Sequence, residues 1–193
     1  AYLSTPAVAA GRWPRQMLSQ GREISGKAMG LVGFGSIGRV TARKAAAMGM
    51  RVLAFDPAIG NDAPQWREFA VEPCPLDDLL SRSDVVSLHL PLTEETRGLI
   101  GKERITRMKA GAILVNSARG GILDEAAVAR ALQEGRLAGA AIDVFDTEPL
   151  AAGSVLADVP NLILTPHIAG VTQESNERVS SLIAQRVAAF LLR

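Results

Sequence analysis

Short apolar runs alternate with longer segments of helical period along most of the chain. Six runs are rich in aliphatic residues and do not alternate with polar ones, which is typical of parallel strands that helices cover on both faces. The predicted strands are AMGLVG (28–33), RVLAF (51–55), SDVVSLHL (83–90), GAILVN (111–116), LAGAAIDVF (137–145) and NLILTPH (161–167).

Segments with helical features lie between these runs. SIGRVTARKAAAMG (36–49) and DEAAVARALQEG (124–135) have helical spacing and end in a glycine, and TEETRGLI begins at Thr93, a favourable N-cap. Strand and helix in alternation predict an α/β fold, in which a doubly wound parallel sheet lies between two helical layers.

Both ends of the chain differ from this middle part. Residues 1–27 hold glycines, prolines and polar residues without a clear strand, and we expect a connecting arm there. Residues 171–193 predict a C-terminal helix with one apolar face. This helix reaches the last residue without a stop signal, so we expect residues 28–170 to be one domain of a longer protein. The apolar face consists of Val179, Leu182, Ile183, Val187, Phe190 and Leu191.

Composition narrows the class of function. Of the 193 residues, 48% are apolar, enough for one sizeable core. The 21 basic and 20 acidic residues give a net charge of +1 without a basic block, so nucleic acid is not an expected partner. No run approaches the roughly 20 apolar residues of a membrane helix, and the start lacks a signal-peptide pattern, so we expect no membrane partner and a cytoplasmic location. One cysteine and two histidines argue against a structural metal site.

The stretch GLVGFGSIGRV contains a glycine-rich turn. Gly33, Gly35 and Gly38 have G-x-G-x-x-G spacing after a predicted strand and at the start of a helix. They permit a tight turn, close approach of the backbone to a pyrophosphate, and close packing of helix on strand. Such glycines also occur in ordinary turns, but this context favours a Rossmann-type fold with phosphates at the helix N-terminus.

The second predicted strand ends in a carboxylate, Asp56, about 20 residues after the glycine turn. At this position a carboxylate accepts hydrogen bonds from the adenosine ribose hydroxyls and repels a 2′-phosphate. Pro57 and Ala58 follow, and no arginine beside them could receive that phosphate. The sequence therefore favours NAD over NADP.

Four polar residues follow the ends of later strands. Arg119 follows AILVN, Asp143 ends LAGAAID, Glu148 comes five residues later, and His167 follows LILTP. Ligands of open α/β sheets bind beyond the carboxyl ends of the strands, so we expect the four side chains to converge on one crevice. Read singly, a histidine after Thr-Pro or a glutamate before proline is as often an ordinary loop residue.

Chemistry suggests a role for each residue. Hydride transfer between a nicotinamide and a secondary alcohol needs a group for the hydroxyl proton, and histidine exchanges protons near neutral pH. We therefore interpret His167 as the acid/base and Glu148 as the carboxylate that orients its ring. Arg119 would hold a substrate carboxylate, and Asp143 would accept a hydrogen bond from the nicotinamide amide.

A second histidine, His89, and the single cysteine, Cys74, are not expected to be catalytic. His89 lies at a strand end in SLHLPLT and is interpreted as mainly structural, although contact with a cofactor stays open. Cys74 lies between two prolines, and no neighbouring base or cation suggests an active thiolate.

The motifs together resemble the NAD-binding domain of the D-isomer-specific 2-hydroxyacid dehydrogenases over almost the whole chain. The matching stretches are GKAMGLVGFGSIGR, VLAFDP, SDVVSLHLPLTEETRGLI, MKAGAILVNSARGGILDE, AAIDVFDTEP and NLILTPHIAGVTQES. The resemblance implies NAD as cofactor and Arg119, Glu148 and His167 as catalytic residues. The expected cofactor contacts include the three glycines of the turn. They are Gly33, Gly35, Ser36, Ile37, Gly38, Asp56, Leu90, Pro91, Ser117, Ala118, Arg119, Asp143, His167 and Gly170.

The resemblance also implies an architecture and an activity. Residues 28–170 would be the NAD-binding domain, residues 1–27 an arm that helps to form a homodimer, and residues 171–193 a helix leading back to a substrate domain that this chain largely lacks. The expected reaction interconverts a D-2-hydroxy acid and its 2-oxo acid, and the missing domain would close the cleft against water.

Alternatives remain at this point. Some relatives are NAD(H)-sensing binding proteins, including transcriptional corepressors, and a third possibility is a chain that only binds NAD and dimerises. The substrate also stays open among hydroxypyruvate, glyoxylate, phosphohydroxypyruvate and sulfonated analogues.

Overall fold

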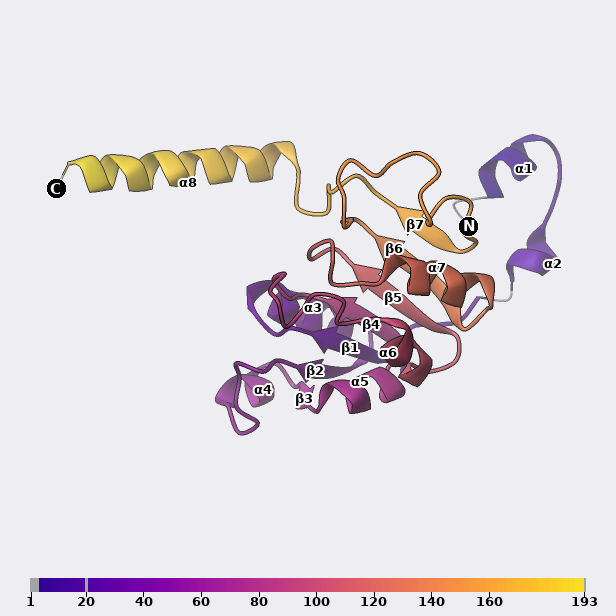
Figure 1. Cartoon of the computed structure of the whole chain (residues 1–193), viewed down its shortest axis with the longest axis horizontal. Coiled ribbons are helices and arrows are strands. Elements are labelled where there is room, and N and C mark those ends of the chain that lie inside the picture. Colours follow the sequence, from indigo (N-terminus) through magenta and orange to yellow (C-terminus); the bar gives the residue numbers. More distant parts are fainter. Residues whose placement is uncertain (1–3, 20, 193) are drawn as a thin grey trace.

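The computed structural model describes residues 4–19 and 21–192. Seven strands within these ranges form one parallel sheet in the order β3-β2-β1-β4-β5-β6-β7 (Figure 1). The strand order changes direction between β1 and β4, which confirms the predicted doubly wound sheet. The strands are β1 (Ala28–Val32), β2 (Arg51–Phe55), β3 (Glu72–Pro73), β4 (Val85–Leu88), β5 (Ala112–Asn116), β6 (Leu137–Ile142) and β7 (Leu162–Leu164).

Helices cover both faces of this sheet. On one face α5, α6 and α7 contribute Leu79, Ile105 and Val128 to the larger buried cluster. On the other face α3 and α4 contribute Ala42 and Trp66 to a second cluster. The three layers expected from the sequence are therefore present. The helices are α1 (Thr5–Ala9), α2 (Arg15–Leu18), α3 (Ser36–Ala47), α4 (Pro64–Glu68), α5 (Leu76–Arg82), α6 (Lys102–Arg107), α7 (Glu125–Gln133) and α8 (Gln173–Leu191).

The prediction of a helix beginning at Thr93 was wrong. Residues 94–98 form successive turns instead. The hydroxyl of Thr96 accepts a hydrogen bond from the Thr93 N–H at 2.7 Å and donates one to the Pro91 carbonyl at 2.7 Å. These bonds compete with helical backbone bonds. Gly98 then adopts a φ of +61°, which a right-handed helix does not allow.

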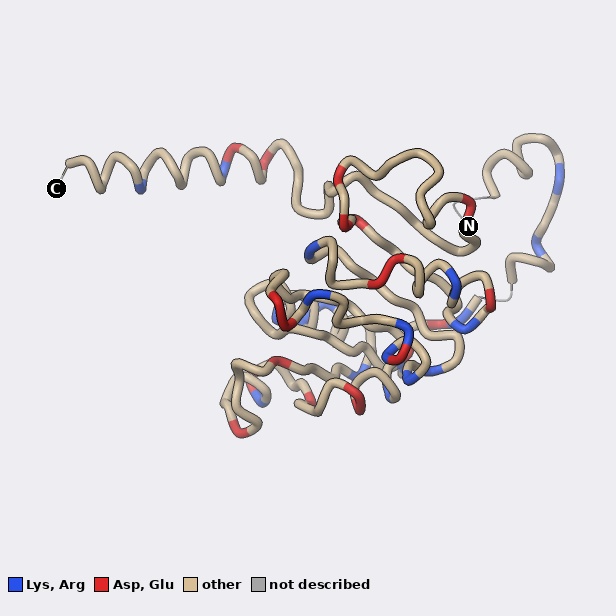
Figure 2. The backbone as a smooth tube through the Cα atoms, viewed as in Figure 1, with Lys and Arg blue, Asp and Glu red and all other residues tan. Residues whose placement is uncertain are grey.

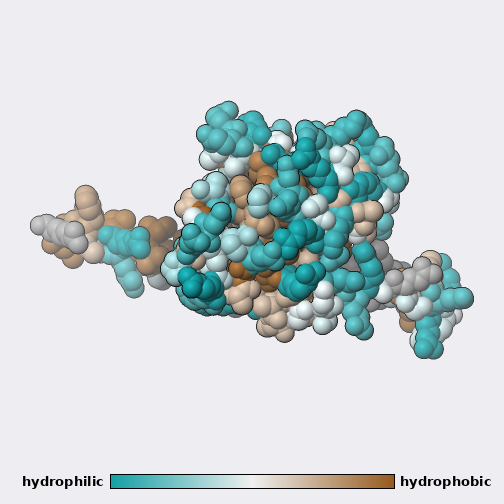
Figure 3. All heavy atoms as spheres, turned by 90° about the horizontal axis from the view of Figure 1, so that it is seen from below, coloured by the Kyte–Doolittle hydropathy of each residue, from teal (hydrophilic) through white to brown (hydrophobic). Residues whose placement is uncertain are grey.

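The two ends of the chain project from the body (Figure 1). The arm carries two short helices, α1 and α2, that the sequence pattern did not indicate. The predicted C-terminal helix is present as α8, and its apolar face is exposed, from 49% at Leu182 to 77% at Phe190. Hydrophobic atoms are visible along this projecting helix in Figure 3.

Charged residues of both signs are dispersed over the body of the molecule (Figure 2). Over the part of the chain that the structure describes, no helix has the length and apolar character needed to cross a membrane.

Candidate active site

The glycine turn joins β1 to α3, and packing requires two of its three glycines. Gly33 has a φ of +100°, and a Cβ there would lie 2.5 Å from the carbonyl oxygen of His89. A Cβ on Gly38 would lie 2.4 Å from the carbonyl oxygen of Gly33, so this glycine lets α3 pack closely on β1.

The middle glycine, Gly35, has a different environment. Apart from Gly35 itself, its chain neighbours and the adjoining helix backbone, no atom of the described residues lies within 4 Å of a Cβ built at this position. Packing therefore does not explain this glycine, whereas a ligand passing close to the backbone does. Gly35 is also the N-cap of α3 and has no side chain to bind the first N–H groups of the helix. The space fits a pyrophosphate at a helix N-terminus.

Asp56 lies directly after β2 and is oriented by the glycine turn. Its Oδ2 accepts the Phe34 N–H at 2.8 Å, and its Oδ1 accepts the Ala58 N–H at 2.9 Å. Each carboxylate oxygen retains a further acceptor position, so ribose hydroxyls can bind there. Asp56 also lines a cavity of about 460 Å³ with Pro57, Ile59, Cys74 and others.

Two residues expected near the adenine have different environments. Leu90 is buried, and its Cδ2 would lie 3.0 Å from a Cβ on Gly33, so its side chain packs beneath the turn. Pro91 is exposed, and its carbonyl accepts the hydrogen bond from Thr96. The expected contact positions that are exposed are Gly35, Ser36, Ile37, Pro91, Ser117, Arg119, His167 and Gly170.

The turn that carries Arg119 follows β5 and is shaped by Asn116. The buried Asn116 side chain accepts the Ala118 N–H at 3.1 Å and donates to the Arg119 carbonyl at 3.0 Å. Sequence analysis did not single out Asn116, although an amide at the end of a buried strand is a possible signal. Arg119 is exposed, and its Nη1 donates to the Ala118 carbonyl at 2.5 Å.

Gly120 brings the Arg119 turn against the loop that follows β6. A Cβ on Gly120 would lie 1.7 Å from the Phe145 carbonyl oxygen and 2.9 Å from the Asp146 nitrogen. Only glycine permits this backbone-to-backbone contact. The next residue, Gly121, has a φ of +76°, which also favours glycine.

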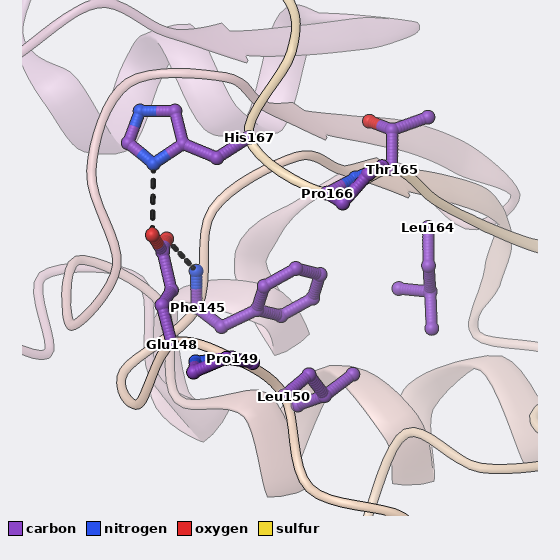
Figure 4. Close-up of a pocket in the computed structure, with 8 residues that line it drawn as sticks. All are labelled: Phe145, Glu148, Pro149, Leu150, Leu164, Thr165, Pro166 and His167. Atoms are coloured by element: carbon purple, nitrogen blue, oxygen red, sulfur yellow. Dashed lines mark hydrogen bonds and ion pairs between the residues drawn. The ribbon is translucent and has the colours of Figure 1, made fainter.

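Glu148 and His167 form a side-chain pair across two loops (Figure 4). The Glu148 Oε2 and the His167 Nδ1 are 2.8 Å apart, and the other carboxylate oxygen accepts the Phe145 N–H at 2.9 Å. The hydrogen bond with His167 and the one from Phe145 hold the pKa of Glu148 below its ordinary value. The carboxylate therefore stays ionised at neutral pH and fixes one nitrogen of the ring.

Asp143 holds the turn in which His167 lies. Its buried carboxylate accepts hydrogen bonds from the Thr165 hydroxyl and, at 2.9 Å each, from the N–H groups of Ile168 and Ala169. The His167 N–H also donates to the Asp143 carbonyl at 2.8 Å, and His167 has a left-handed φ of +54°. Burial raises the pKa of Asp143, but the hydrogen bonds, first the one from Thr165, outweigh burial and leave the pKa lowered.

A cavity of about 630 Å³ opens beside the Glu148–His167 pair. The Glu148 and His167 side chains lie on one side of the group shown in Figure 4, and Thr165 and the leucine, phenylalanine and proline side chains form the remainder. The lining residues are Phe145, Glu148, Pro149, Leu150, Leu164, Thr165, Pro166 and His167. The shape and lining suit a small organic ligand better than a polymer.

The structure brings together part of the expected constellation. Glu148 and His167 are in contact, and Asp143 bonds to the turn of His167. The turn of Arg119 contacts the Glu148 loop through the backbone of Gly120 and Phe145. The Arg119 guanidinium itself donates to the Ala118 carbonyl. Within residues 4–19 and 21–192, no group of three or more His, Cys, Asp or Glu side chains could hold a metal ion.

Comparison with known proteins decides the family. Residues 3–169 match the profile of the family described as D-isomer specific 2-hydroxyacid dehydrogenase, NAD binding domain. The chain belongs to the D-isomer-specific 2-hydroxyacid dehydrogenase family. NAD is the cofactor of this domain, which agrees with the fit at Gly35 and Asp56.

Relatives within the family act on several small acids. The chain is 53% identical to the (S)-sulfolactate dehydrogenase of Chromohalobacter salexigens over 97% of its own length and 60% of that protein. It resembles the D-lactate dehydrogenase of Aquifex aeolicus, solved with NAD and lactic acid, with a TM-score of 0.84 and 35% identity over 96% of this chain and 60% of that one. A glyoxylate reductase from Paecilomyes thermophila gives a TM-score of 0.86 at 34% identity, over 97% of this chain and 56% of that one. The chain thus spans up to about 60% of the length of these relatives.

Proposed function

We propose that this chain is the cofactor domain of an NAD-dependent dehydrogenase that interconverts a small D-2-hydroxy acid and its 2-oxo acid. The observation that carries the proposal is the Glu148–His167 pair, with 2.8 Å between Oε2 and Nδ1, beside a cavity at the carboxyl ends of β6 and β7. A carboxylate–imidazole pair at a ligand cavity is suited to proton transfer.

His167 serves as the acid/base in this proposal. Glu148 accepts the hydrogen bond at Nδ1, so the opposite nitrogen, Nε2, is the one that gives a proton to the substrate oxygen or takes one from it. Glu148 fixes the ring orientation, and the Phe145 N–H fixes Glu148 in turn.

Arg119 binds the substrate carboxylate. Its side chain is exposed and bonds within the structure to the neighbouring Ala118 carbonyl, so it can turn to an anion at little cost. A guanidinium and a carboxylate form two parallel hydrogen bonds, which fixes both the position and the orientation of a small acid.

The cofactor residues have separate tasks. The open space at Gly35 and the first N–H groups of α3 receive the pyrophosphate, and Asp56 binds the ribose. Bound NAD supplies hydride transfer at its nicotinamide ring. Asp143 uses three acceptor positions on the turn of His167, which leaves a position for the nicotinamide amide.

The proposal extends to the whole protein. Residues 1–27 form an arm used in a homodimer, residues 28–170 bind NAD, and residues 171–193 lead to a substrate domain, in a cytoplasmic enzyme. The relatives named above act on sulfolactate, glyoxylate and lactate, which supports a small 2-hydroxy or 2-oxo acid as the substrate class.

The test is NADH oxidation by the full-length protein with a panel of sulfopyruvate, hydroxypyruvate, glyoxylate and pyruvate. We expect turnover with at least one of these acids and preference for NADH over NADPH, because Asp56 repels a 2′-phosphate. NADH binding without turnover on any of the acids would contradict the proposed activity.

A further inference from the structure

The peptide group between Phe145 and Asp146 is a meeting point of the Arg119 turn and the Glu148 loop. Its carbonyl oxygen lies against the backbone of Gly120, which follows Arg119. Its N–H donates a 2.8 Å hydrogen bond to the Oε1 of Glu125, the first residue of α7. Both sides of one peptide group are therefore held by the segment that begins with Arg119.

The same short loop determines the position of Glu148. The Phe145 N–H donates to the Glu148 Oε1 at 2.9 Å, and the Glu148 Oε2 contacts the His167 ring. A shift of the Phe145–Asp146 peptide would move the N–H that holds Glu148, and thus the carboxylate that orients the ring.

Glu125 is the stronger of two side-chain restraints on this loop. The ion pair between Arg97 and Asp146 has an N–O distance of 3.9 Å, and its side chains are 55% and 65% exposed. Exposed pairs of this kind contribute little. Glu125 is a half-buried residue, and its carboxylate accepts a 2.8 Å backbone hydrogen bond at the surface, which is shorter than the Arg97–Asp146 contact. Charge-assisted hydrogen bonds are roughly twice as strong as neutral ones.

We propose that Glu125 is a positioning residue for the reaction, which holds the Phe145–Asp146 peptide so that Glu148 lies in register with His167 and with the Arg119 turn. The inference rests on the proposed function. Glu125 does not reach the cavity lining itself and acts through the backbone of the loop.

The experiment compares Glu125→Ala with Glu125→Gln in the full-length protein. Alanine removes the acceptor for the Asp146 N–H, whereas the glutamine side-chain oxygen retains it. Glu103→Ala is the matched control, because Glu103 is also a first-turn carboxylate, on α6, and pairs with Arg107 of the same helix. The melting temperature of each variant is measured to check that the fold is kept.

Three quantities are measured: kcat, NADH affinity, and the titration of the Glu148 carboxyl group by NMR. For Glu125→Ala we expect kcat to fall between about 10-fold and 100-fold, since small misplacements of reacting groups have effects of this size. NADH affinity should stay unchanged. The pKa of Glu148 should rise toward its ordinary value as the Phe145 and His167 contacts loosen.

Glu125→Gln should lie much closer to the wild type than Glu125→Ala in all three measurements, because it keeps the acceptor in a weaker, neutral hydrogen bond. Two results would overturn the inference: Glu125→Ala behaving like Glu103→Ala, or Glu125→Gln being as impaired as Glu125→Ala. If the wild-type protein has no turnover, the proposed function fails, and the carboxyl titration of Glu148 still decides the role of Glu125.

Discussion

The Glu148 carboxylate joins two loops: its Oε2 lies 2.8 Å from the His167 Nδ1, and its Oε1 accepts the Phe145 N–H at 2.9 Å. One oxygen thus faces the imidazole, and the other is fixed by the backbone of its own loop. In the proposed mechanism the second ring nitrogen of His167, Nε2, exchanges the proton with the substrate, so the reaction depends on Glu148 being ionised.

Changing Glu148 to Gln should lower kcat by about 10²-fold to 10⁴-fold, because a neutral amide does not stabilise the protonated ring or select its orientation. Hydrogen bonds from His167 and Phe145 lower the pKa of Glu148, so wild-type turnover should not depend on its protonation until the pH falls below the ordinary range of glutamate. A pH–rate profile of the wild type and the variant measures both the loss of kcat and the pH at which wild-type turnover begins to fall. An unchanged profile in the glutamine variant would contradict the role of Glu148.

Asp143 should make stability depend on pH. Its folded pKa is lowered, so its carboxylate contributes stability above its unfolded pKa of about 3.9, and this contribution is lost as the pH falls through the lower folded value. Asp143→Asn should cost about 1–3 kcal/mol at neutral pH, because the three donors of the His167 turn lose a charged acceptor. Urea unfolding of both proteins from pH 7 to pH 3 should show the difference shrinking. A difference that is constant across this range would count against this assignment.

Alanine substitutions at two glycines of the same turn should affect different properties, stability at Gly38 and NADH binding at Gly35. Gly38→Ala places a Cβ 2.4 Å from the Gly33 carbonyl and should lower the free energy of unfolding by about 1–3 kcal/mol. Gly35→Ala meets open space, so it should keep the melting temperature and weaken NADH binding. Gly21→Ala, also in open space but in the arm, is the control for both measurements. Normal NADH binding by the Gly35 variant would refute the pyrophosphate site.

Cys74 offers a chemical probe of the adenosine side. It lines the same cavity as Asp56, and burial raises the pKa of its thiol. Alkylation should therefore be slow at pH 7 and accelerate as the pH rises above the ordinary thiol range of about 8.5. Saturating NADH should suppress the reaction, which mass spectrometry of the Cys74 peptide can follow. Equal rates with and without NADH would place the cofactor elsewhere.

The sequence predicted the sheet and the residues at its strand ends because both follow from local patterns. Buried parallel strands are apolar runs, so the positions directly after them, such as Asp56 and Asp143, can be identified without knowing the strand order. The two-residue strand β3 has too few residues for such a pattern, and the turn from Thr93 depends on one hydroxyl, that of Thr96.

Contacts between distant segments were beyond sequence reasoning. That Gly120 touches the Phe145 carbonyl, or that Glu125 binds the Asp146 N–H, depends on how the loops after β5 and β6 pack. The interpretation of Asp143 likewise emphasised the cofactor, whereas its carboxylate bonds to three groups of the His167 turn. The roles of the predicted residues stay predictions, and the structure adds the contacts among them.

The most direct test of the central claim is the turnover of His167→Ala in the full-length protein, measured together with NADH affinity on the best acid of the panel. His167 is exposed, so the substitution should leave the fold intact. We predict that kcat falls by about 10²-fold to 10⁴-fold while the dissociation constant for NADH is unchanged. Wild-type turnover by this variant would contradict the account.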